Sequence, residues 1–421
     1  MAEQTRIVVT GMGAVTPYGA GVSSFWEGII SGRSAIIETP DEYLRQWAPA
    51  TAPAVSFKPE QFMNPRLLQQ TDRFTQLAIA AVAEALQDAG WADGAALHDS
   101  CASDRIGISV GNSLGGVQSL EEGSARLSSG KSSRVSARLV PKALPNAAAG
   151  TIAKLHDIHG PVMTYSAACA SSANSIGEAS YWLRLDQADV VLAGGTECLF
   201  SPSILSSLRS AGALADGEGD FAAWSRPFDK NRTGMVMGEG AAFLVLEKLE
   251  HARARGAKIY AELVGYGTSN DAYHETSPDP TGRSAKLAME RALRSAGLGV
   301  GDIDYINAHA TATPAGDQAE ANALRELFGE ELNRIPVSSI KGSVGHMLGA
   351  AGAIESVACV KALGEGILPP TVNCDDKEDW APADIVPNAS RVQPVKRVLS
   401  NSFGFGGQNG VLIWQHADLL R

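Results

Sequence analysis

Short runs of β-branched and apolar residues alternate along the chain with longer stretches in which apolar residues recur every three or four positions. RIVVTG at 6–11 predicts a strand, and RFTQLAIAAVAEALQDAG at 73–90 predicts a helix. The next elements expected in this half are strands at 105–111, 162–167 and 189–195 and a helix at 172–185. Such an alternation is typical of an α/β fold in which helices cover a largely buried sheet.

The alternation restarts near residue 256. The stretch 241–256 is predicted to begin as a strand and to end as a helix. The strands and helices expected after it lie at 259–267, 284–296, 303–310, 317–329, 352–366, 397–407 and 410–416. We therefore predict two halves of similar plan, 1–256 and 257–421, within one compact unit, because no low-complexity linker separates them.

Composition narrows the class of protein. The chain has 421 residues, of which 44% are hydrophobic and 19% are charged, as in an ordinary globular protein. Its net charge of −11 argues against a nucleic-acid-binding protein, which needs a basic surface. The opening MAEQTR does not resemble a signal peptide, and no apolar run is long enough to span a membrane. We therefore expect a cytoplasmic protein without a membrane segment.

Metal and nucleotide motifs are absent or incomplete in the sequence. The five cysteines stand far apart and form no CxxC pair, which suggests neither a disulfide framework nor a zinc site. GMGAVT at 11–16 follows a strand as a dinucleotide fingerprint does, but Thr16 stands where that fingerprint has glycine or alanine. SGKS at 129–132 lacks the earlier glycine of a P-loop, because Ala125 stands in its place. We expect no metal and no nucleotide cofactor.

Ser113 is a formal candidate for the nucleophile of a serine hydrolase. GNSLG at 111–115 follows a predicted strand and matches the G-x-S-x-G pattern of such enzymes. A Gly-rich turn between a strand and a helix explains the same residues. We favour the turn, and a hydrolase stays open as an alternative.

Cys169 stands between a predicted strand and a predicted helix of small residues, in TYSAACASSANSIGEA at 164–179. Buried packing is the ordinary role of a lone cysteine. A thiol at a helix N-terminus instead feels the positive end of the helix dipole, which favours the thiolate and a role as nucleophile. This stretch alone leaves both roles open.

Two histidines have the same setting as this cysteine. NAHATATPAGDQAE places His309 at the end of a strand, and SSIKGSVGHMLGAAGAIES places Lys341 and His346 in a Gly-rich turn before a helix. Strand ends of an α/β sheet converge on ligand sites. We therefore expect Cys169 and the two histidines to lie together.

The chain resembles the β-ketoacyl-[acyl-carrier-protein] synthases, in particular the type II elongating enzymes and their polyketide relatives. The motifs that carry the resemblance are, in chain order, RIVVTGMGAVTPYG, SAACASSANSIGEA, VLAGGTE, RPFDKNRTGMVMGEGAAFLVLE, DAYHETSPDP, NAHATATPAGD, KGSVGHMLGAAG and NSFGFGGQN. The resemblance implies a thiolase-like fold, in which two βα halves stack in five αβαβα layers, and usually a homodimer. The half 1–256 would carry the nucleophile and the half 257–421 both histidines.

The resemblance also implies a reaction and a division of labour. Cys169 would accept an acyl group, and His309 and His346 would act in the decarboxylation of malonyl-carrier. Lys341 and Glu355 match the charged pair that supports the histidines. The product would be a β-ketoacyl-[acyl-carrier protein] of fatty-acid, polyketide or polyene biosynthesis.

Further residues match the substrate contacts of the family. Thr311 and Thr313 correspond to contacts of the pantetheine arm, and Leu114 borders the acyl channel. Phe405 corresponds to a gate beside the cysteine, and its backbone N–H, with that of Cys169, would form the oxyanion hole. No cofactor is expected, since the substrates arrive on the phosphopantetheine arm of an acyl carrier protein.

The partner chain and the pathway stay open. A homodimer, a heterodimer with a ketosynthase-like chain and a non-catalytic role like that of a chain-length factor are the alternatives, and retention of Cys169 speaks against the last. The family usually reads H-G-T-S-T-P and G-G-T-N, and often has Ser or Thr after the lysine. The residues that depart from this pattern are Ala310, Ala312, Gly342 and Gln408. They leave the catalytic groups in place and change the walls around the substrate.

A basic segment offers a docking surface for the carrier. Acyl carriers of this type are acidic, and so is this chain, so docking needs a local basic patch. The segment 124–142 has five basic residues and no acid: Arg126, Lys131, Arg134, Arg138 and Lys142. A solvated loop would have the same composition.

Overall fold

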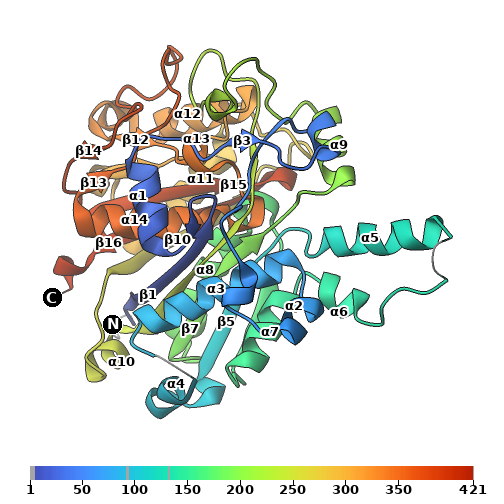
Figure 1. The fold of residues 1–421 in the computed structure, drawn as a ribbon. Coiled ribbons are helices and arrows are strands. Elements are labelled where there is room, and N and C mark those ends of the chain that lie inside the picture. The colour runs from blue at the N-terminus through green and yellow to red at the C-terminus, as the bar shows by residue number, and fades with distance from the viewer. Residues whose placement is uncertain (1–4, 92–93, 131–132, 421) are drawn as a thin grey trace.

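The computed structural model describes residues 5–91, 94–130 and 133–420, and its centre is a large twisted sheet (Figure 1). Five strands of this sheet come from the first half of the chain: β1 (Ile7–Thr16), β5 (Ile106–Gly111), β6 (Val162–Tyr165), β7 (Val190–Glu197) and β9 (Gly240–Lys248). Five come from the second half: β10 (Ala261–Asn270), β11 (Tyr305–Asn307), β12 (Val337–Ser338), β15 (Arg397–Phe403) and β16 (Gln408–His416).

The two sets of strands have the same topology. Their orders across the sheet are β6-β5-β7-β9-β1 and β12-β11-β15-β16-β10. In both sets the three strands at the outer end run parallel and the others pair antiparallel. β1 pairs with β10 through Val8–Glu262 and Val9–Ala261, which joins the two sets. The predicted α/β fold with two halves of similar plan is confirmed.

Helices cover and separate the two sets of strands, which gives the five layers. α3 (Arg73–Asp88) and α7 (Ala147–Leu155) pack on the first set, and α11 (Arg283–Ala296) and α12 (Pro314–Phe328) lie on the outer side of the second. α8 (Ser171–Arg184) and α14 (Ala351–Glu365) lie between the sets. α14 is buried from Ala351 to Val360, and its residues there are mostly small and apolar on every face of the helix rather than amphipathic.

The GMGAVT stretch belongs to a strand and not to a nucleotide-binding turn. All six residues lie within β1 and are buried. The glycines let α3 pack closely on β1, since a Cβ at Gly13 would lie 1.9 Å from the carbonyl oxygen of Ala81. The expectation that this motif does not bind a nucleotide therefore has a packing explanation.

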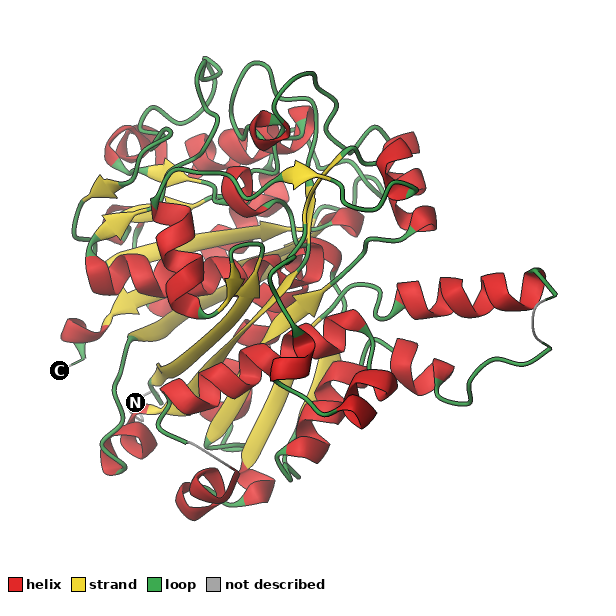
Figure 2. Cartoon of the chain, viewed as in Figure 1, coloured by secondary structure: helices red, strands yellow, loops and turns green. Residues whose placement is uncertain are grey.

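The remaining elements surround these layers (Figure 2). The helices are α1 (Val22–Ile30), α2 (Pro65–Gln70), α4 (Gly94–Ser100), α5 (Val117–Ser128), α6 (Leu139–Ala143), α9 (Pro202–Ser210), α10 (Leu249–Ala254) and α13 (Lys341–Val344). The short strands are β2 (Gly19–Ala20), β3 (Ile37–Glu38), β4 (Ala50–Ala52), β8 (Met237–Gly238), β13 (Ile367–Leu368) and β14 (Arg391–Val392). No helix in the described part of the chain is both long and apolar enough to cross a bilayer.

The basic segment forms an arm that projects from the body of the molecule (Figure 1). The arm consists of α5, α6 and the connection between them. Its described basic residues border one surface hollow: Arg126, Arg134, Arg138 and Lys142. Lys131, like part of the SGKS motif, lies outside the described residues. A docking role for this arm stays a prediction.

Candidate active site

Cys169 lies at the junction of a strand and a helix. After β6, a short 3₁₀ turn (Ala168–Ala170) carries Cys169, and α8 begins at Ser171. The turn is tight, because Ala168 has a φ of 47° and Ala167 N donates to Ser171 Oγ at 2.8 Å. Cys169 is only 4% exposed, so its thiol faces the interior.

Burial decides the protonation state of Cys169. It raises the pKa of the thiol to about 12, although the N–H of Phe405, the ammonium group of Lys341 and the N–H of Cys169 itself favour the thiolate. Loss of solvation therefore outweighs these groups. Burial thus favours the neutral thiol, which needs a base before it can act as a nucleophile.

His346 is placed to be that base. Its Nε2 atom lies 2.9 Å from Cys169 Sγ. The backbone of His346 is held by β8, because His346 N donates to Val236 O at 2.7 Å and Gly238 N donates to His346 O at 2.9 Å. Burial, followed by the charge of Lys341, lowers the pKa of His346 well below its usual value. A neutral imidazole can accept the thiol proton through Nε2.

His309 completes the group. It follows β11, and its ring meets that of His346 edge to face with centroids 5.4 Å apart. Burial, Lys341 and His346 lower the pKa of His309 well below its usual value, so this imidazole is neutral as well. The Nδ1 atoms of both rings have no hydrogen-bond partner among the described residues. No carboxylate of the described residues therefore accepts a hydrogen bond from Nδ1 of either ring, where it would stabilise the protonated form.

Two carboxylates of α12 hold the loop that carries His309. Glu320 accepts hydrogen bonds from His309 N at 2.9 Å and Ala310 N at 2.7 Å. Asp317, one turn earlier, accepts from Ala312 N at 3.1 Å. Ala312 has a φ of 67°, which is unfavourable for alanine, so the loop needs these bonds to keep its shape. The sequence did not predict the two carboxylates, because their partners are backbone groups.

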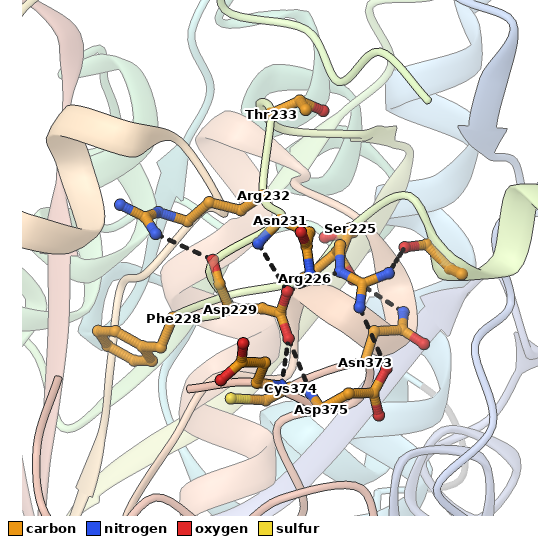
Figure 3. Close-up of polar contacts among 12 residues, drawn as sticks. Ser225, Arg226, Phe228, Asp229, Asn231, Arg232, Thr233, Asn373, Cys374 and Asp375 are labelled. Atoms are coloured by element: carbon orange, nitrogen blue, oxygen red, sulfur yellow. Dashed lines mark hydrogen bonds and ion pairs between the residues drawn. The ribbon is translucent and has the colours of Figure 1, made fainter. Parts of the chain in front are cut away.

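A second polar network supports Asp317, and Figure 3 shows the part of it that surrounds Asp229. Asp317 accepts from Phe228 N at 2.8 Å, and Arg232 Nε lies 3.7 Å from the same carboxylate. Phe228 and Arg232 belong to a loop that Asp229 fixes. The groups that donate to Asp229 are Arg226 Nε at 3.1 Å and the backbone N–H groups of Asn231, Asp375 and Asp376, each at 2.8 Å. The RPFDKNRTG motif thereby connects to the His309 loop.

A buried ion pair lies beside the histidines. Lys341 Nζ contacts the carboxylate of Glu355, and both side chains are 2% exposed. Burial raises the pKa of Glu355 to about 7, although Lys341 and Ser402 favour its ionised form. The charge of Lys341 helps to keep both histidines neutral. The pair therefore stands where the sequence analysis expected a supporting role.

A pocket links the buried groups to the surface. Cys169 and the two histidines line its inner end, and the exposed residues Thr276 and Ser277 line its outer end. Thr311 and Thr313 lie along its wall, with their hydroxyl oxygens 3.0 Å apart. The two threonines can form hydrogen bonds to an amide-containing chain that enters from the surface.

Phe405 separates this pocket from a second hollow of about 400 Å³, since it lines both. Leu114, which the resemblance places at the border of the acyl channel, lines the second hollow and is 46% exposed. Gln408 also borders this hollow. The apolar residues around it include Leu199, Ile204, Leu208 and Leu348.

Backbone N–H groups converge on the sulfur of Cys169. Those of Phe405 and of Cys169 itself both interact with the thiol. Gly404 permits the approach of the two segments, because a Cβ there would lie 2.5 Å from Ala167 O. The pair assigned to the oxyanion hole is thus adjacent to the sulfur. Packing also explains Gly342, where a Cβ would lie 2.6 Å from Val372 O.

Cys169, His309 and His346 are also the residue types that ligate metals, and their ligand atoms lie within 4.8 Å of one another. The 2.9 Å between Sγ and Nε2 is a hydrogen-bond length. It is shorter than the ~3.5 Å expected between two ligands of a tetrahedral zinc ion with Zn–S and Zn–N bonds of about 2.3 and 2.0 Å. The geometry fits proton transfer better than metal binding.

Ser113 has a different setting. Its hydroxyl donates to the buried carboxylate of Glu197, which also accepts from Ser113 N at 2.8 Å and from Gly349 N at 3.2 Å. Within the described ranges, no histidine is hydrogen-bonded to Ser113. A nucleophilic serine needs a base that takes its proton, and a second group to orient that base. The hydrolase alternative is therefore not favoured.

Comparisons with known proteins agree with this site. The family description "Beta-ketoacyl synthase, N-terminal domain" matches residues 4–252, and "Beta-ketoacyl synthase, C-terminal domain" matches residues 260–375. The 3-oxoacyl-[acyl-carrier-protein] synthase 2 of Vibrio cholerae is 40% identical over 416 residues, which cover 98% of this chain and 99% of that protein.

Two solved structures are similar over nearly the whole chain. One is the acyl-carrier protein of a type II polyketide synthase in complex with its ketosynthase bound to the hexaketide, with a TM-score of 0.91 and 30% identity over 99% of this chain and 100% of that one. The other is the ishigamide ketosynthase/chain length factor, with a TM-score of 0.90 and 30% identity over 98% and 100%. The full-length matches, the five-layered fold and the Cys–His–His group together show that the chain belongs to the beta-ketoacyl synthase family.

Proposed function

We propose that the protein condenses an acyl group, held on Cys169, with malonyl-[acyl-carrier protein], and releases carbon dioxide and a β-ketoacyl-[acyl-carrier protein]. The observation that carries this proposal is the 2.9 Å contact between Cys169 Sγ and His346 Nε2, beside His309, at the buried end of a pocket that reaches the surface. Such an enzyme needs no cofactor of its own, because the carrier presents each thioester.

The first step transfers the acyl group from the carrier to the enzyme. His346 Nε2 accepts the thiol proton as the sulfur attacks the thioester carbonyl. The carbonyl oxygen gains negative charge, which the N–H groups of Cys169 and Phe405 stabilise. The tetrahedral intermediate then expels the pantetheine thiolate, which takes the proton that His346 Nε2 had accepted. An acyl-Cys169 thioester remains.

The second step removes carbon dioxide from malonyl-carrier. Cleavage of the C–C bond leaves its electron pair on the remaining thioester as an enolate, whose oxygen needs hydrogen-bond donors. The neutral imidazoles of His309 and His346 supply N–H groups for this oxygen, and His346 acts here as the tautomer that has its proton on Nε2, which exchanges with the Nδ1 tautomer through solvent. The enolate carbon attacks acyl-Cys169, the bond to the sulfur breaks as the β-ketoacyl-carrier forms, and the Cys169 thiolate that leaves takes a proton from solvent.

A direct test supplies both substrates. Incubation of the protein with an acyl-carrier and [¹⁴C-carboxyl]malonyl-carrier is expected to release labelled carbon dioxide and to give a β-ketoacyl-carrier whose acyl chain is longer by one two-carbon unit. Mass spectrometry of the carrier and scintillation counting measure the two products. Hydrolysis of the acyl-carrier without any extension would contradict the proposal.

The proposal includes a second protein chain of the same fold. Most of the exposed large apolar side chains in the described part of the protein lie between residues 114 and 185, among them Leu120, Val140 and Met163. Met163 is on β6, which forms one end of the sheet. Exposed apolar surface next to an unpaired strand supports association with another chain. A homodimer and a heterodimer with a ketosynthase-like chain both fit.

The proposal keeps the division of the chain into 1–256, which carries Cys169, and 257–421, which carries His309 and His346. It also keeps a cytoplasmic location. The relative from Vibrio cholerae supports a role with fatty acyl chains, whereas the solved polyketide and ishigamide enzymes support a specialised pathway. We favour the specialised pathway, because Gln408 borders the second hollow where the family has threonine.

The lowered pKa values of the two histidines predict that the rate of Cys169 acylation depends little on pH. An imidazole acts as a base only when it is neutral. An imidazole with an unperturbed pKa becomes protonated, and so stops acting as a base, as the pH falls through about 6.5. Since both histidines have pKa values well below this, they stay neutral at pH 6. The single-turnover rate of Cys169 acylation is expected to change less than about twofold between pH 8 and pH 6. A fall with a midpoint near 6.5 would refute this assignment.

The second hollow is expected to receive the acyl chain. Leu114→Phe narrows it and should disfavour long acyl primers, with a loss of roughly 1 kcal/mol for each methylene group that no longer fits. We expect kcat/KM for a ten-carbon primer to fall at least tenfold, while that for a two-carbon primer stays within twofold. The control is Leu155→Phe, an exposed site outside this hollow. An unchanged primer profile for Leu114→Phe would mean that the acyl chain lies elsewhere.

A further inference from the structure

A polar groove of about 690 Å³ lies next to the outer end of the active-site pocket. It is bordered by the start of α11, by α12 and by the loop before α11. Its residues are Asp279, Thr281, Arg283, Lys286, Asn322, Arg325 and Glu326, and we call it the cationic groove. Asp279 lines both the groove and the pocket of Cys169, and Gly282, between two residues of the groove, lines the pocket as well. The two spaces therefore adjoin.

The positive charges of the groove are poorly neutralised. Among the described residues, no carboxylate lies within ion-pair distance of the guanidinium groups of Arg283 or Arg325. Lys286 reaches only Glu290, at 3.9 Å. On a protein with a net charge of −11, Arg283 and Arg325, which pair with no carboxylate among the described residues, together with Lys286 form a local site for an anion.

One of these cations is held in position. Arg325 Nη2 donates to Trp380 O at 2.5 Å, and Arg325 Nη1 donates to Asn322 Oδ1 at 3.1 Å. Asn322 in turn donates to Pro280 O at 3.0 Å, in the loop that leads to the pocket. These partners are uncharged, so they orient the guanidinium group without cancelling its charge. Such a preordered group loses little entropy when it binds an anion.

The carboxylates of Asp279 and Glu326 do not fully neutralise the positive charge of the cationic groove. Asp279 Oδ1 accepts from Thr281 N at 2.9 Å and from Thr281 Oγ1 at 2.7 Å, which stabilises its own turn. Glu326 is exposed. The residual charge is positive, and it lies on the side of the groove formed by Arg283 and Lys286.

We propose that the cationic groove binds the phosphoryl group of the phosphopantetheine arm, and so sets the depth to which the thioester enters the pocket. This inference rests on the proposed function. The arm has one anionic group, at the end away from the thioester, and that end remains at the surface when the thioester reaches Cys169. Guanidinium groups suit phosphate oxygens because they donate two parallel hydrogen bonds. Carrier protein and coenzyme A both present this group.

The test compares thioesters that differ in the phosphoryl group. Arg283→Glu is the principal variant, because the Arg283 side chain is exposed and its loss removes no contact in the described structure. Decarboxylation is measured with malonyl-phosphopantetheine and with malonyl-pantetheine. We expect KM for the phosphorylated compound to rise about fivefold or more, with kcat unchanged. KM for malonyl-pantetheine is expected to stay within twofold. Malonyl-carrier should follow the phosphorylated compound.

The matched control is Arg294→Glu, which changes the same charge on the same helix at an exposed position outside the groove. An equal rise in KM for this control would assign the effect to net charge and overturn the proposal. Equal effects of Arg283→Glu on both pantetheine compounds would also overturn it. A rise for malonyl-carrier but not for malonyl-phosphopantetheine would mean that the groove contacts the carrier protein rather than the phosphoryl group.

Calorimetry separates failure of the groove from failure of the proposed function. Phosphopantetheine without an acyl group is titrated into the wild-type protein and into Arg283→Glu, with pantetheine as the reference ligand. Tighter binding of phosphopantetheine that disappears in the variant supports the groove, whether or not any thioester reacts. Equal binding of the two ligands overturns the groove and leaves the condensation reaction unaffected.

Discussion

Cys169→Ala is expected to abolish acyl-enzyme formation and condensation, and to leave the decarboxylation of malonyl-carrier measurable. Among the described residues that line the pocket, Cys169 is the one with a thiol that can form a thioester, so its loss is expected to stop acyl transfer. Loss of carbon dioxide places charge on an oxygen, and His309 and His346 can still donate to it. Condensation should fall by roughly 10³-fold or more, as for loss of other covalent nucleophiles. Intact mass and carbon dioxide release measure the two activities.

Cys198→Ala provides the matched control. Cys198 is a second buried cysteine, it packs against the other face of the first set of strands, and it does not line the pocket. Condensation by this variant is expected to stay within a few-fold of wild type. If Cys169→Ala still condenses substrates, or if it loses decarboxylation as well, Cys169 does not have the separate role given to it.

His309→Ala is expected to have the opposite effect. Decarboxylation should fall by roughly 10²-fold or more, the usual scale for loss of one positioned donor to a developing oxyanion. Acyl-Cys169 should still form, because the group in contact with the thiol is His346 and not His309. The measurement is the release of labelled carbon dioxide from malonyl-carrier, together with the intact mass of the acyl-enzyme.

The contact between His346 and Cys169 makes His309 the better probe of decarboxylation. His346→Ala would remove the base of the first step and a donor of the second, so it should impair both. His159→Ala serves as the control for loss of an imidazole, since His159 is 65% exposed and pairs with Asp157 outside the site. Wild-type decarboxylation by His309→Ala would show that the oxyanion finds its donors elsewhere.

The main elements of the fold could be predicted from the sequence because their patterns are local. β1, α3, β5, α8 and β7 fall within a few residues of the expected ranges, since buried strands and helices leave distinct apolar periods. The arm of α5 and α6 was not recognised as secondary structure. Most of its residues are polar, basic or small, so it lacks the apolar run of a core helix, and a segment that projects from the body has little core to face.

The site was predicted less completely, for electrostatic reasons. Cys169 and the two histidines were found because each stands among small residues between a predicted strand and a predicted helix. Glu320 and Asp317 were missed, because a carboxylate that binds backbone N–H groups of a distant loop leaves no pattern in the sequence. The protonation state of Cys169 could not be predicted, because the extent of burial around the thiol depends on segments far apart in the chain. Such effects follow from tertiary packing and cannot be derived from local periodicity.

The central claim is that Cys169 carries the acyl group between two carrier-bound substrates, and intact-mass spectrometry of the enzyme tests it most directly. After incubation with an acyl-carrier, the protein should gain the mass of one acyl group, and peptide mapping should place it on Cys169. Addition of malonyl-carrier should remove that mass while β-ketoacyl-carrier appears in equal amount. An enzyme that makes the product without ever gaining this mass, or that carries the acyl group on Ser113, would contradict the account.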